Sequence, residues 1–303
     1  MLKRLLLELA ESRTLRRWLE QSRVGQRLAA RFVAGRELDA ALAAIARLAA
    51  ADMQATLDHL GENVTTEAKA MEAAASAAAS LEAIAARGLP ADISVKLTQF
   101  GLDLGEESAW RNLARVAERA RALNSRVEVD MESSAYTAAT LRLVERAHAE
   151  RLPIVAVLQA YLRRSADDLE RLCRQAIPVR LVKGAYREPA AAAFQSKHEV
   201  NANFLRLMRR LLTGPGGAAI ATHDPALIAA ARAQARELGL APQRFEFQML
   251  YGIRRDLQQA LTAEGWRVRV YLPYGAEWYP YFMRRLAERP ANLLFLLRQL
   301  AKS

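Results

Sequence analysis

The sequence predicts an α/β protein built as one (β/α)8 barrel of the TIM type. Eight short apolar runs alternate with longer helix-like stretches from about residue 53 onward. Roughly 250 residues are usual for such a barrel, and a chain of 303 residues provides them. No G-x-G-x-x-G motif occurs in the chain, which disfavours the competing doubly wound nucleotide-binding sheet.

The eight apolar runs predict the strands of this barrel, because each has the length of a buried parallel strand. They are residues 55–60, 93–97, 127–131, 154–159, 179–184, 219–223, 245–250 and 267–273. Each is followed by a connection long enough for a crossover helix. The connections include residues 108–123, 135–150, 166–176, 199–212, 225–238 and 253–263.

Residues 1–52 predict a helical arm that precedes the barrel of residues 53–303. Apolar residues recur in the arm at spacings of three and four, among them Leu5, Leu9, Leu38, Leu42 and Ile45. Gly25 and Gly35 are expected to divide the arm into short helices. Trp18 and the arginines would suit a helix on a membrane surface, but helices that cap the domain core are the favoured interpretation.

Composition excludes several classes of protein. The chain carries 44 Lys and Arg against 33 Asp and Glu, a formal charge of +11, and 52% of its residues are hydrophobic. The single cysteine excludes an internal disulfide and a cysteine-based zinc site, and the four histidines are too scattered for a metal cluster. Neither a signal peptide nor a membrane span is expected, so we expect a cytoplasmic protein.

The positive charge leaves nucleic acid, an anionic membrane surface and acidic ligands open as partners. Many arginines alternate with apolar residues in helical stretches, as do Arg111, Arg115, Arg119 and Arg121. This pattern is typical of a solvated helix face.

Polar residues stand at the ends of most of the predicted strands. They are Lys96, Asp130, Gln159, Arg180, Lys183, Thr222, His223, Gln248 and Tyr271. In a barrel of this type the carboxyl ends of the strands surround the active site. Two interpretations stay open at this point. The lysines and Arg180 form an anion-binding set, with Asp130 paired to one of these cations, or Lys96 or Lys183 forms a Schiff base in a lyase.

A second cluster lies near the end of the chain, in residues 281–288. A helix there would carry Tyr281, Arg284, Arg285 and Glu288 on neighbouring faces. The adjacent arginines are either exposed, with an ordinary i,i+4 pair between Arg284 and Glu288, or they present two guanidinium groups to a carboxylate.

Seven strings of residues occur in the order found in the proline dehydrogenase family, which the chain resembles from about residue 58 to residue 292. They are ISVKLTQ (93–99), VDME (129–132), VLQAYL (157–162), RLVKGAY (180–186), ATHD (221–224), FEFQMLYG (245–252) and YFMRRLAE (281–288). The resemblance implies a flavoenzyme with a distorted barrel and a final helix over the barrel mouth.

The resemblance also implies roles for single residues. Asp130 and Arg180 would be catalytic, with Arg180 close to the flavin N5. Arg284 and Arg285, with Lys96, would bind the substrate carboxylate, and Tyr186, Leu250 and Tyr271 would pack around the proline ring. A smaller polar residue replaces Tyr271 in relatives that act on hydroxyproline. The residues expected along FAD are Met131, Gln159, Arg180, Lys183, Gly184, Ala185, Thr222 and His223.

The expected reaction is oxidation of L-proline to Δ1-pyrroline-5-carboxylate, by hydride transfer to FAD. Electrons would then pass to a membrane quinone, and the basic charge would allow peripheral contact with the inner face of the membrane. A separate pyrroline-5-carboxylate dehydrogenase would act downstream, because the chain is too short to contain one. The alternatives are the Schiff-base lyase and a basic nucleic-acid-binding protein, which lacks a recognised module here.

Overall fold

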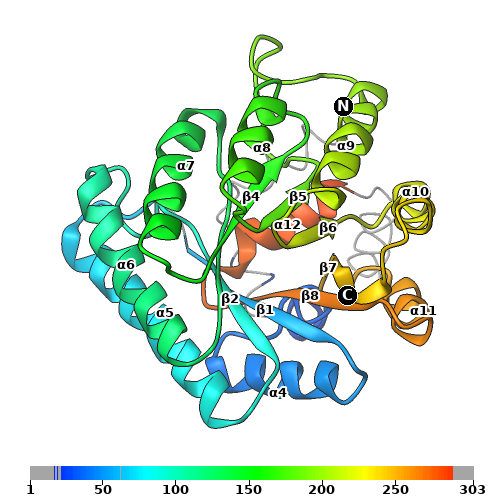
Figure 1. Cartoon of the computed structure of the whole chain (residues 1–303). Coiled ribbons are helices and arrows are strands. Elements are labelled where there is room, and N and C mark those ends of the chain that lie inside the picture. The colour runs from blue at the N-terminus through cyan, green and yellow to red at the C-terminus, as the bar shows by residue number, and fades with distance from the viewer. Residues whose placement is uncertain (1–16, 18, 20–21, 62, 289–303) are drawn as a thin grey trace.

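A computed structural model describes residues 17, 19, 22–61 and 63–288 of the chain. Within these residues, eight parallel strands close into a barrel in sequence order, with the last strand beside the first. Figure 1 shows the helices arranged around the outside of this ring. The strands are β1 (Gln54–His59), β2 (Ala91–Val95), β3 (Val127–Val129), β4 (Ile154–Gln159), β5 (Val179–Val182), β6 (Ala218–Ala221), β7 (Phe245–Leu250) and β8 (Arg267–Tyr274). The predicted barrel is confirmed.

The predicted strands differ from the observed ones mainly where they reach the mouth of the barrel. β3 and β5 each end two residues before the predicted end. Asp130 and Gly184 lie beyond these ends, and the φ angle of Gly184 is +118°, a conformation that ends a regular strand. The apolar runs therefore continue into the loops that carry site residues.

The outer helices follow their strands at the expected places. They are α5 (Glu67–Ala86), α6 (Glu106–Ala122), α7 (Ser134–Ala149), α8 (Ser165–Arg174), α9 (Lys197–Leu212), α10 (Pro225–Glu237) and α11 (Arg255–Ala263), with a short 3-10 turn η1 (Pro242–Arg244) before β7. Local signals set several helix starts: Ser196 and Glu199 form a capping box on α9, and Asp224 caps α10 just before Pro225. The arginines of α6 are exposed, as predicted.

The arm contributes α3 (Arg23–Ala29) and α4 (Leu38–Ala49), and the stretch 1–16 together with Trp18 lies outside the described residues. The predicted helix break at Gly25 is wrong, because Gly25 lies inside α3. A side chain there would overlap the backbone of Leu19, so this glycine allows a close approach. Gly35 does separate the two helices. α4 buries Leu42 and Ile45 in the main core, while the boundary at residue 52 stays a prediction.

The last described helix, α12 (Trp278–Glu288), lies across the middle of the ring in Figure 1. It is held by a group of buried residues that we call the mouth cluster. The cluster comprises Leu19, Ala29, Phe32, Val33, Leu60, Ile253, Trp278, Tyr279, Tyr281, Phe282 and Met283. The ring centroids of Phe32 and Phe282 are 6.1 Å apart. The arm and α12 therefore hold each other at one end of the barrel.

The two faces of the strands differ in chemistry. Alternate residues such as Val127 and Val129 are buried with the apolar core beneath the helices. The residues between them, such as Glu128, contact side chains of strands that are not neighbours in the sheet. Such contacts can form only through the barrel interior, so this barrel is filled largely by polar side chains. Among the described residues, no helix is both long and apolar enough to cross a bilayer.

Candidate active site

A cavity of about 760 Å³ opens at the carboxyl ends of the strands. Side chains from α12 line it together with the strand ends, so the expected position of the final helix over the barrel mouth agrees with the structure. The predicted site residues that line it are Lys96, Asp130, Met131, Gln159, Arg180, Lys183, Gly184, Ala185, Tyr186, Thr222, His223, Leu250, Tyr271 and Arg285. The side chain of Arg284, and with it the pair to Glu288, lies outside the described structure.

Asp130, Arg180 and Tyr271 form the centre of the cavity floor. Arg180 Nη2 donates to Asp130 Oδ1, and Tyr271 Oη donates to Asp130 Oδ2 at 2.6 Å. The Arg180 guanidinium carbon lies 5.0 Å from the centroid of the Tyr271 ring, which is within reach of a cation–π contact. The expectation that Asp130 pairs with a cation is confirmed.

Burial and charge act in opposite directions on these groups. Burial disfavours the ionised form of Asp130, but Arg180 and Lys96 outweigh it and hold the pKa of Asp130 below its usual value. Burial raises the pKa of Tyr271 well above its usual value, and the charge of Asp130 raises it further. At neutral pH the site therefore contains a carboxylate that accepts hydrogen bonds and a phenol that donates one.

Lys96 lies between two carboxylates. Its Nζ is 3.0 Å from Asp58 Oδ1 and 3.5 Å from Asp130 Oδ2. Asp58 was missed in the sequence, although it stands near the end of the first apolar run. Lys183 likewise pairs with Asp224 Oδ2 at 3.0 Å. A Schiff base would have to break these ion pairs, so both contacts disfavour the lyase interpretation.

A further carboxylate, Glu128, lies beneath Arg180 and was also missed. Arg180 Nη1 donates to Glu128 Oε2 at 2.7 Å, and Gln248 Nε2 donates to Glu128 Oε1 at 2.6 Å. Burial raises the pKa of Glu128, while Arg180 and Arg269 oppose that rise. The signal in the sequence was the strict alternation of apolar and polar residues in 127–130, which is unusual for a parallel strand.

The predicted cofactor residues lie at the carboxyl ends of β3 to β6. A Cβ on Gly184 would overlap the Tyr161 ring, so only glycine leaves this backbone in place. His223 Nε2 accepts the Leu250 backbone N–H at 2.8 Å, which fixes the orientation of the imidazole. Gln159 Nε2 donates to the Glu132 carbonyl at 2.8 Å. Among the described residues, no group of three His, Cys, Asp or Glu side chains could hold a metal ion.

Comparison with known proteins agrees with this geometry. The proline dehydrogenase family matches residues 41–298. Proline dehydrogenase 1 of Bacillus subtilis (strain 168) is 39% identical over 303 residues, covering 100% of both chains. Proline dehydrogenase of Deinococcus radiodurans is 39% identical over 282 residues, covering 91% of this chain and 90% of the relative. Proline utilization A from Bdellovibrio bacteriovorus, in a crystal structure of the protein inactivated by N-propargylglycine, is 25% identical, with a TM-score of 0.81; the match covers 86% of this chain and 32% of that one. The chain belongs to the proline dehydrogenase family.

Proposed function

We propose that the chain binds FAD in the mouth cavity and oxidises L-proline there to Δ1-pyrroline-5-carboxylate. Membership of the family supports proline as the substrate. The observation that carries the rest of the proposal is the mouth cavity of about 760 Å³. It brings together the residues expected to bind the cofactor and the described residues expected to bind the substrate, and its volume lies in the range of cofactor and ligand sites.

The residues of the cavity fit a flavin. Arg180 is buried, and its Nε has no hydrogen-bond partner within the described part of the chain. A buried donor of this kind is usually satisfied by a bound group. Lys183, Lys197 and Arg254 line the same cavity and offer positive charge to phosphates. When bound, the flavin supplies the hydride acceptor that no protein side chain provides.

The side chains would orient and activate the substrate. Arg284 and Arg285 on α12 would bind the proline carboxylate, with Lys96 as a third cation. These positive charges lower the pKa of the bound secondary amine, and the amine must be neutral before hydride can leave the adjacent carbon. Tyr186, Leu250 and Tyr271 would pack around the ring. Arg180 would stabilise the negative charge that develops on reduction.

We infer that the electrons pass to a membrane quinone and that a separate enzyme oxidises the product. A quinone dissolves in the bilayer, so the enzyme must visit the membrane surface. The formal charge of +11 favours such contact with anionic lipids. A cytoplasmic enzyme with peripheral attachment at the inner face of the membrane fits this proposal. Reduction of a short-chain quinone analogue by proline and the purified protein would test the acceptor class.

A visible absorption spectrum of the purified protein, recorded before and after anaerobic addition of L-proline, tests the central proposal. We expect flavin bands that bleach when proline is added. A flavin that stays oxidised with proline but bleaches with hydroxyproline would correct the substrate. A colourless protein that FAD cannot reconstitute, and that borohydride links to a carbonyl substrate, would instead support the lyase.

A further inference from the structure

Arg180 is held at both ends of its guanidinium by carboxylates, one from β3 and one from the residue that follows this strand. Nη2 donates to Asp130 and Nη1 donates to Glu128 at 2.7 Å. Residues 128 and 130 stand two apart at the end of β3, so both side chains enter the barrel interior. The two bonds, together with the Tyr271 ring at 5.0 Å, fix both the position and the plane of the guanidinium.

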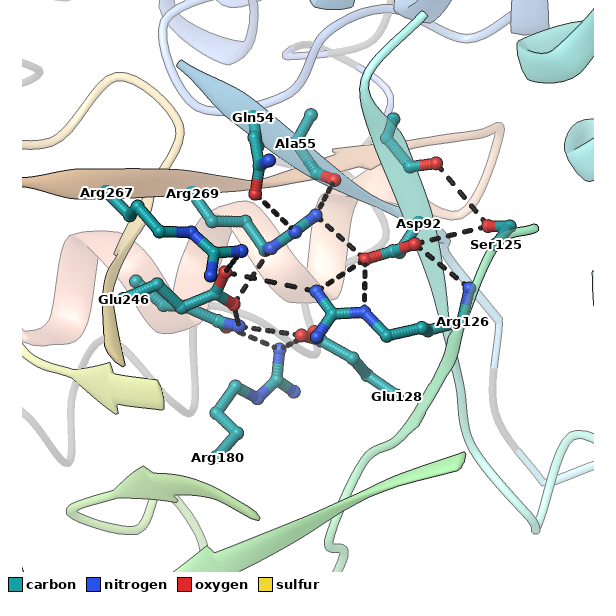
Figure 2. Close-up of polar contacts among 12 residues, drawn as sticks. Gln54, Ala55, Asp92, Ser125, Arg126, Glu128, Arg180, Glu246, Arg267 and Arg269 are labelled. Carbon is teal, nitrogen blue, oxygen red and sulfur yellow. Dashed lines mark hydrogen bonds and ion pairs between the residues drawn. The ribbon is translucent and has the colours of Figure 1, made fainter. Parts of the chain in front are cut away.

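Glu128 has no solvent contact and belongs to a network that continues toward the amino end of the barrel. Gln248 Nε2 donates to Glu246 Oε1 at 2.8 Å as well as to Glu128. Arg269 Nε donates to Glu246 at 2.9 Å, and its Nη1 lies 3.0 Å from Asp92 Oδ2. Figure 2 shows one continuous set of polar contacts that reaches from Arg180 to Arg126 and Ser125. The network holds Glu128 in place from the side that faces the amino end of the barrel.

We propose that Glu128 is a positioning residue that fixes Arg180 and sets the net charge beside the flavin. This inference rests on the proposed function. Asp130 lines the mouth cavity and reaches Arg180 from that side, whereas Glu128 does not line the cavity and reaches Arg180 from the barrel interior. Its part in the reaction therefore acts through the two cavity residues that it bonds, Arg180 directly and Gln248, which also bonds Arg180.

The hydrogen-bond partners of Glu128 favour its ionised form, against the rise in its pKa that burial causes. Each of its two carboxylate oxygens accepts an N–H, one from Arg180 and one from Gln248, so the charged form makes both bonds. With Glu128 and Asp130 both ionised, the group formed with Arg180 carries one net negative charge. An arginine that belongs to such a group stabilises a reduced, anionic flavin less than an arginine with one carboxylate partner would.

Two substitutions separate the two effects. Glu128→Gln keeps the shape of the side chain but removes its charge, so we expect the midpoint potential of the bound flavin to rise. Glu128→Ala removes the lower anchor of Arg180, so we expect the limiting rate of flavin reduction by proline to fall at least tenfold. The half-saturating proline concentration should stay unchanged, because Glu128 does not contact the carboxylate-binding residues.

Asp92→Asn is the matched control. Asp92 is also a buried carboxylate of the network, but it bonds to Arg126 and Arg269 and not to Arg180. We expect Asp92→Asn to lower the melting temperature while leaving the flavin potential and the limiting rate at the wild-type values. A purely structural role of Glu128 would give its variants the same result as this control.

Flavin potentials from spectroelectrochemical titration, stopped-flow reduction rates and melting temperatures decide the matter. The inference is overturned if Glu128→Gln leaves the potential unchanged, or if Asp92→Asn raises it equally. A limiting rate for Glu128→Ala within twofold of wild type overturns it too, and if that variant does not fold, the potential of Glu128→Gln decides alone. A wild-type protein that binds no flavin, or is not reduced by proline, would refute the proposed function instead.

Discussion

Replacement of Lys96 by methionine should reveal how much the buried charges of the site depend on one ammonium group. The Lys96 side chain is 9% exposed, and those of Asp58 and Asp130 are 2% and 12% exposed. Methionine keeps most of the volume but removes the charge. Asp130 still has Arg180 as a cation partner, so Asp58 becomes the carboxylate that has lost its cation. Loss of one partner of a buried pair costs about 3–5 kcal/mol, and we expect a value near the lower end of this range.

The stability cost of Lys96→Met should depend on pH, and the pKa of Asp130 gives the direction of that dependence. Lys96 helps to hold the pKa of Asp130 below its usual value, so Lys96→Met raises that pKa. A depressed pKa stabilises the fold above the unfolded pKa of about 3.9, and this stability is lost as the pH falls through the folded value. Because the pKa of Asp130 is higher in the variant, the variant gains less stability from this carboxylate and loses less of it as the pH falls. The difference in unfolding free energy between the two proteins should therefore shrink as the pH falls from 7 to about 3, which is below the unfolded pKa.

Urea unfolding followed by circular dichroism measures both quantities, because a domain of this kind is expected to have roughly 5–15 kcal/mol of stability. Lys69→Met is the matched control, since Lys69 is exposed on α5 and its substitution also removes one positive charge. The reasoning is refuted if Lys96→Met costs no more than Lys69→Met, or if its cost is the same at both pH values.

Three further outcomes test the rest of the site. Arg285→Met, and likewise Arg284→Met, should raise the proline KM about 10- to 150-fold, since each removes a charge-assisted contact worth roughly 1.5–3 kcal/mol. The flavin should stay bound in both variants. An unchanged KM in steady-state kinetics would contradict this. Tyr271→Ser should increase the kcat/KM for hydroxyproline relative to proline, and an unchanged ratio would remove its role in specificity. Gly184→Ala should lower both the flavin content and the melting temperature, because the added methyl meets the Tyr161 ring at a φ of +118°; absorbance per protein equal to wild type would disprove it.

The sequence predicted the barrel and most of the cavity because both depend on local patterns. A strand that ends in a polar residue places that residue at the mouth in any parallel barrel, and this alone brought Lys96, Asp130 and Tyr271 together. Asp58 and Glu128 escaped the same reasoning. Glu128 lies before the end of its strand, where a barrel interior is normally aliphatic, and its partners Arg180 and Gln248 are remote in sequence.

Two local features were not specified by the sequence, for different reasons: the bounds of α5 and the place of Gly25 inside a helix. α5 is rich in alanine, and its apolar residues do not concentrate on one face, so the periodicity that identifies a helix is weak. Gly25 lies inside α3 because of a close contact with Leu19, and no local pattern reports such a contact. Glycine inside a helix and glycine between helices look the same when only the sequence is read.

The mouth cluster joins the first described part of the chain to the last. During synthesis, Phe32, Val33 and Leu60 leave the ribosome long before Trp278 and Phe282. At about 5–20 residues per second, the chain between Leu60 and Trp278 requires roughly 10–45 s. Throughout that interval the apolar surface of the arm has no partner from α12, although the earlier strands can already pair. A nascent chain stalled before α12 would therefore expose aromatic and aliphatic side chains of the mouth cluster, which are prone to aggregation. This is the stage at which a chaperone would protect the chain best.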